Sequence, residues 1–174
     1  MLTAACVPPG VTTVVEKGVS EARGGRGDLQ EVTPLPAGNV LDRFRSVRVL
    51  PVQSSPDSGP IPNTLPGVLE TTLVNGIREA QLFPGRGTPT LFVRVRVTTY
   101  WQDEGLLQVL RAYSEILARV EFLEERRPTP LGAYYVRGFS TAIKRKSDAD
   151  LSAGLTSSVV EIIKQHRSAS LKDK

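Results

Sequence analysis

The chain has 174 residues, of which 40% are hydrophobic and 23% are charged, and its formal net charge is +4. This length and composition suit one globular domain with a tail. Of the 22 basic residues 16 are arginine, and they form no continuous basic run, so a nucleic-acid-binding patch is not predicted. No stretch approaches the ~20 apolar residues that a membrane-spanning helix needs.

The chain contains one cysteine, Cys6, and one histidine, His166. A disulfide within the chain is therefore impossible, and a zinc site built from Cys and His is close to excluded. A phosphate loop, a dinucleotide fingerprint and a nucleophile elbow are also missing from the sequence. We therefore predict no catalytic residues, no metal site and no cofactor.

Small residues stand immediately before the cysteine, in Thr3-Ala4-Ala5-Cys6, and a Pro/Gly-rich stretch follows it. This pattern resembles the bacterial lipobox, in which the cysteine thiol carries a diacylglycerol. The resemblance implies that Cys6 is the lipid attachment site, that residues 1–5 are the remnant of a signal peptide, and that translation starts further upstream. The alternative is that Cys6 is a stray cysteine at a disordered end.

Residues 6–40 show little apolar periodicity and carry two breaker clusters, Gly24–Asp28 and Pro34–Gly38. Glycine and proline are rare inside regular elements, so this segment is predicted to be a flexible tether. Residues 41–168 are predicted to form a single α/β domain, and 169–174 a polar tail.

The domain is predicted to open with a strand and a helix. Residues 44–52 alternate apolar and polar side chains, which is typical of a half-buried strand. Asn63 or Thr64 is the predicted N-cap of a helix running to about residue 81, with Pro66 in its first turn. The predicted core face of this helix contains Leu65, Val68, Leu69, Leu73, Ile77 and Ala80.

A second strand is predicted over residues 91–98, but residues 106–125 fit both a helix and an alternating strand. We favour the strand, because a four-residue hairpin loop would match both faces at once. In that register Val93 faces Ile116 and Arg94 faces Glu115.

Residues 133–141 are predicted to form another strand, with a bulge at Gly138, and a last helix is predicted to start at Ser147 or Asp148. The order is β-α-β-β-β-α. The predicted fold class is α/β (α+β), a two-layer sandwich in which two helices pack on one face of a mixed sheet.

This order, together with the segments Ala118–Glu124 and Leu131–Ser140 and the closing helix, resembles a set of small bacterial envelope lipoproteins of unknown function. Those proteins are similar in architecture to the N-terminal domain of TolB and the periplasmic domain of CsgG. The resemblance covers residues 44–166. It implies a non-enzymatic accessory or assembly role, a partner in the envelope, and a periplasmic location with an anchor, preferably in the outer membrane. The oligomeric state stays open.

One strand carries a basic and aromatic cluster, formed by Arg94, Arg96, Tyr100 and Trp101. Such a cluster can stack on nucleic acid or sugar, so it is the predicted binding face. The simpler interpretation is the solvated face of a strand, and nucleic acid is not the expected partner. The alternative function that this face suggests is a cytoplasmic binding module for nucleic acid or protein.

Overall fold

The computed structural model describes residues 25–168 except 57, 103–113, 126 and 141–147. Cys6, the first part of the predicted tether, the predicted hairpin loop and the tail lie outside the described residues. The described elements are β1 (Gly25–Thr33), the 3-10 helix η2 (Val40–Arg43), β2 (Ser46–Val49), β3 (Gln53–Ser54), α1 (Leu65–Glu79), β4 (Thr90–Gln102), β5 (Ser114–Glu124), β6 (Gly132–Ser140) and α2 (Asp148–Gln165).

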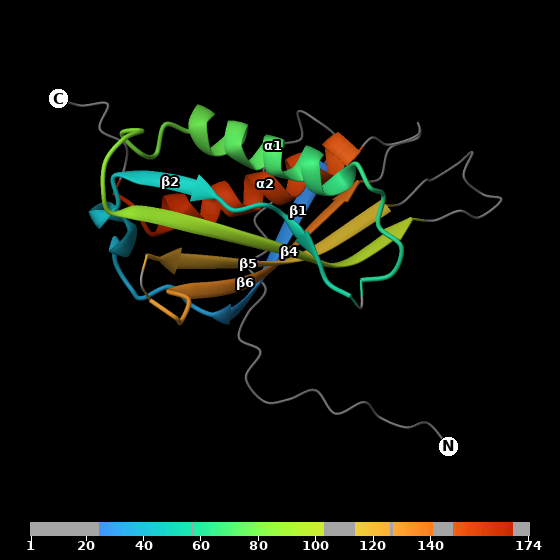
Figure 1. Cartoon of the computed structure of the whole chain (residues 1–174), viewed down its shortest axis with the longest axis horizontal. Helices are drawn as coiled ribbons and strands as arrows, with labels where there is room; N and C mark the ends of the chain where they lie inside the picture. The colour runs from blue at the N-terminus through green and yellow to red at the C-terminus, as the bar shows by residue number, and fades with distance from the viewer. Residues whose placement is uncertain (1–24, 57, 103–113, 126, 141–147, 169–174) are drawn as a thin grey trace, which may run out of the picture.

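The strands form one open mixed sheet in the order β1-β6-β5-β4-β2, and β3 also pairs with β4. β2 and β3 run parallel to β4, whereas the other pairs are antiparallel. The two helices pack against each other and against the sheet, so the molecule has two layers (Figure 1). The predicted fold class is confirmed, because the chain order β2-α1-β4-β5-β6-α2 is the predicted β-α-β-β-β-α.

The core lies between the sheet and the helices. α1 contributes Leu65, Leu69, Leu73 and Ile77, all buried, while Val68 is half-buried. Each fully buried aliphatic side chain stabilises the fold by ~1.5–3 kcal/mol, so this face fixes α1 on the sheet. The sheet contributes the residues whose numbers alternate along β4, β5 and β6, among them Leu91, Val93, Val95, Val97, Ile116, Ala118, Val120, Phe122, Tyr134 and Val136.

The edge strand β1 differs from the sequence prediction, which placed its residues in the tether. Residues 25–33 pair with β6, with one register shift between Glu31 and Thr33, so the domain includes them. The strand contains few apolar residues, and Gly27 explains why it nevertheless holds α2 closely. A Cβ atom at Gly27 would lie 2.2 Å from the Ser158 Oγ and 2.4 Å from the Gly154 carbonyl oxygen.

Gly138 of β6 has the same role. A Cβ atom there would lie 2.5 Å from the Leu151 carbonyl oxygen of α2. The predicted bulge at Gly138 is wrong, because the β5–β6 register runs without a shift from Ser114↔Ser140 to Phe122↔Gly132. The glycine is required by the close helix backbone, not by an irregular strand.

The ambiguous segment is a strand over Ser114–Glu124, as favoured, but the predicted register is wrong. Arg94 faces Glu121 and Val93 faces Phe122. The predicted and observed registers put the same side chains on each face, because the slide between them at these positions is an even number of residues. Alternation therefore identified the faces, but it did not fix the register, and the predicted loop lies outside the described residues.

Tyr134 joins the segment after β1 to the core. Its hydroxyl oxygen accepts a hydrogen bond from the Leu35 N–H at 3.0 Å, and its ring meets Phe122 edge to face at 5.9 Å. The side chain is 1% exposed, and burial raises the pKa of the Tyr134 hydroxyl above its ordinary value.

We predict that Gly138→Ala lowers the free energy of unfolding by about 2 kcal/mol or more, because the new methyl group meets helix backbone that has no room to move. Urea unfolding followed by circular dichroism measures this loss. Gly67→Ala is the matched control, since a Cβ there meets nothing within 4 Å and a helix favours alanine by up to ~1 kcal/mol. Equal stability of the two variants would contradict the close-approach explanation.

We predict that Tyr134→Phe costs about 1–3 kcal/mol, because the buried Leu35 N–H loses its acceptor. The raised pKa also has a pH signature: its stabilising contribution is full below pH ~10 and is lost as the pH rises through the folded-state pKa. Thermal unfolding between pH 8 and 11 should therefore show a smaller alkaline loss in the variant. An unchanged alkaline profile would show that Tyr134 does not cause it.

Candidate functional site

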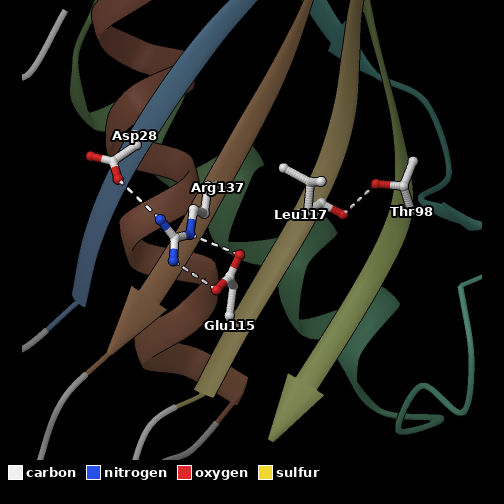
Figure 2. A network of polar contacts seen from close by, with 5 residues as sticks. All are labelled: Asp28, Thr98, Glu115, Leu117 and Arg137. Carbon is white, nitrogen blue, oxygen red and sulfur yellow. Dashed lines mark hydrogen bonds and ion pairs between the residues drawn. The ribbon is translucent and has the colours of Figure 1, made fainter. Parts of the chain in front are cut away.

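The sheet face opposite the helices is crossed by ion pairs that link neighbouring strands. Arg137 of β6 pairs with Glu115 of β5 at 2.7 Å and with Asp28 of β1 at 3.7 Å (Figure 2). On β4 of the same view the Thr98 hydroxyl donates to the Leu117 carbonyl oxygen at 3.0 Å. The guanidinium therefore bridges two carboxylates across three strands.

A second group of ion pairs lies further along the same face. Glu121 holds Arg119 at 3.0 Å and Arg94 at 3.3 Å. At the end of β5, Glu124 is opposite the buried Leu91 and so is on the helical side of the sheet, where it holds Arg43 at 3.0 Å and Arg127 at 2.9 Å. On the open face, Arg94, Arg119 and Arg137 thus have carboxylate partners, so much of the positive charge there is locally balanced.

The predicted binding face is divided by the structure. Arg94, Arg96 and Trp101 lie on the open face, where Trp101 is 48% exposed and opposite Glu115. Tyr100 points to the helical side, because a register shift between Val97 and Thr99 changes the alternation. Its ring packs against the core and its hydroxyl donates to the Gln102 side-chain oxygen at 3.0 Å. Three of the four residues therefore share one face of the sheet.

The described residues hold no group of three or more His, Cys, Asp or Glu side chains that could bind a metal ion. His166 follows α2, and its Nδ1 atom lies 3.0 Å from the Ile162 carbonyl oxygen. Among the helices of the described ranges, none has both the length and the apolar character needed to cross a membrane.

Edge strand β2 carries two adjoining pockets that sequence reasoning missed. An apolar pocket of about 460 Å³ lies between β2 and α1, lined by Val47, Val49, Val74, Ile77, Arg78, Gln81, Phe83 and Gly85. A second pocket, also about 460 Å³, is lined by Ser46, Val47, Arg48, Gly85, Arg86, Gly87, Thr90, Phe92 and Glu125. The two share Val47 and Gly85, so they meet across the edge of the sheet.

The second pocket is positively charged. Arg48 and Arg86 are exposed and have no ion-pair partner within the described part of the chain, although Glu125 also lines the pocket. Sequence reasoning had little signal for this pocket, because the Gly85-Arg86-Gly87 loop and β2 are far apart in the chain. The pairing of β2 with β4 brings them together.

We predict only weak binding of single-stranded DNA, because Arg94 is already paired and Tyr100 lies on the other face. Fluorescence anisotropy with a labelled oligodeoxythymidine should give a Kd weaker than ~10⁻⁴ M at physiological salt. A micromolar Kd that rises steeply with salt, together with loss of binding in both Arg96→Ala and Trp101→Ala, would instead favour the nucleic-acid module.

No family model matches the chain, and no curated protein sequence matches it either. Solved structures, by contrast, do match the chain. The PelC dodecamer from Paraburkholderia phytofirmans has a TM-score of 0.54 at 14% identity, covering 79% of this chain and 96% of PelC. A single-substitution variant of the same PelC, also a dodecamer, has a TM-score of 0.53 at 12% identity, covering 83% of this chain and 99% of PelC. Protein XCC0632 from Xanthomonas campestris reaches a TM-score of 0.48 at 13% identity, covering 76% and 88%. At these identities, the likeness to PelC establishes a shared fold.

Proposed function

We propose that this chain is a non-enzymatic accessory or assembly lipoprotein of the bacterial cell envelope. In this proposal a lipid on Cys6 anchors it, preferably to the outer membrane, and the domain self-associates and binds another envelope component. The observation that carries the proposal is the fold likeness over nearly the whole length of PelC, whose structures are dodecamers. Because this domain matches PelC over almost all of PelC's length, it can present surfaces comparable to those of PelC to other copies of itself.

The open face of the sheet supports a binding role. Its charges are arranged as bridged pairs across strands, which favours a broad contact with a protein over a small site with converging reactive groups. Half-buried Leu117, Tyr135 and Phe139 lie among them. Such mixed apolar and paired polar surfaces are typical of protein–protein contacts.

The sequence before the domain supports the anchor. Residues 7–24 separate Cys6 from β1, and a chain of that length reaches at most about 65 Å. A triacylated cysteine would hold the domain firmly, because about two acyl chains are needed for stable attachment. The alternative, a cytoplasmic module acting through Arg94, Arg96 and Trp101, has less support because Arg94 is paired with Glu121.

The anchor is tested by expressing the gene with its natural upstream region in a bacterial host and weighing the product by mass spectrometry. We expect a mature protein that begins at Cys6 with a diacylglycerol and an N-acyl chain, and that fractionates with the outer membrane.

Cys6→Ser is the control and should remain unprocessed or leave the membrane fraction. An unmodified Cys6 thiol on a chain found in the cytoplasm would overturn the proposed anchor and location. It would also make the cytoplasmic binding module the leading hypothesis.

A further inference from the structure

The sheet ends in two open edges. β1 forms one and β2 the other, and within the described residues neither has a strand on its outer side. The outward backbone N–H and C=O groups of such edges are templates for another strand. We propose that β1 of one copy pairs with β2 of a second copy, so that the sheet continues from copy to copy. This inference rests on the proposed self-association and names its surface.

The strand directions agree with this pairing. β2 is parallel to β4, and each step from β4 through β5 and β6 to β1 is antiparallel. β1 therefore runs opposite to β2. Copies placed side by side with their helices on the same side thus bring β1 and β2 together as an antiparallel pair.

Both edges carry apolar side chains on the helical side, although exposed Glu31 of β1 is on that side as well. Leu29 of β1 is opposite the buried Val136, so it faces the helices, and it is itself only half-buried. Val47 and Val49 of β2 also face the helices and line the apolar pocket. Leu29 of a second copy would enter this pocket and cover side chains that one copy leaves half-exposed.

The side chains on the open side are complementary in charge. Asp28 is on the same face as Arg137, and their 3.7 Å ion pair is the longest of those between described residues. Arg48 and Arg86 line the basic pocket beside β2 and have no carboxylate partner among the residues described. In the pairing, Asp28 of a second copy supplies that carboxylate. A β2–β2 pairing would instead bring two basic pockets together.

The pairing uses different surfaces on the two partners. Repeating contacts of this kind close into a ring or continue as an open filament. The dodecamers formed by PelC, which shares this fold, support a closed assembly. A continuous sheet closes into a ring only when its strands are tilted and staggered. Neighbouring copies can therefore be shifted relative to each other along the strand direction.

The test is charge exchange in the whole chain, followed by sedimentation velocity over a range of concentrations. We expect the natural sequence to self-associate. Asp28→Arg and Arg48→Asp should each raise the concentration needed for association at least tenfold, because each places like charges at the contact. An equimolar mixture of the two variants, and the double variant, should both recover association.

Two further variants separate contact from folding. Val47→Lys should also weaken association, because it places a charge in the apolar pocket. Lys164→Asp, a charge reversal on exposed α2 surface, should leave association unchanged. Thermal unfolding should confirm that every variant is folded, including Asp28→Arg, which sets an arginine beside Arg137.

The possible results separate the β1–β2 pairing from the self-association on which it rests. Association that persists in both single variants, or that is not recovered in the double variant, overturns β1–β2 pairing and leaves self-association intact. A natural chain that stays monomeric at all concentrations overturns both the pairing and the proposed self-association. The anchor on Cys6 is decided separately by mass spectrometry.

Discussion

The backbone contact between α2 and the strands beneath it is the constraint on which the rest of the structure depends. Gly27 and Gly138 have no side chain where α2 passes, so the helix backbone rests directly on β1 and β6. α1 then packs beside α2, where Gly76 leaves room for the Thr156 methyl group. Leu151 and Leu155 of α2 lie at this contact and are buried there.

Local patterns in the sequence predicted most of the elements, because their causes are local. The apolar face of α1 and the alternation of β4 are visible in any short window. β5 was predicted as a strand because both of its faces match those of β4, but alternation alone does not distinguish registers that differ by an even number of residues. β1 was missed for a different reason. Its glycines appear as breakers in the sequence, and only the helix above Gly27 shows that this one allows close packing.

The candidate surfaces were predictable to a smaller extent. Alternation placed Arg94 and Arg96 on one face, but the register shift that turns Tyr100 to the other side has no signal in a single sequence. The ion pairs that balance Arg94 and Arg137 come from β5 and β1, so their partners depend on strand order. The basic pocket needs Arg48 and Arg86 from segments separated by a whole helix, and only the tertiary fold brings them together.

The position of β1 also has a mechanical consequence. β1 is the first described strand, and eight of its nine residues pair with β6. Tension applied from the N-terminal side therefore acts first on this strand at Gly25. A pull along the strand axis would strain all the ladder hydrogen bonds together, whereas a pull across it would break them one after another. A protein held at its N-terminus would thus resist detachment in one direction much better than in the other, and the direction of the connection to β1 would decide its strength under force.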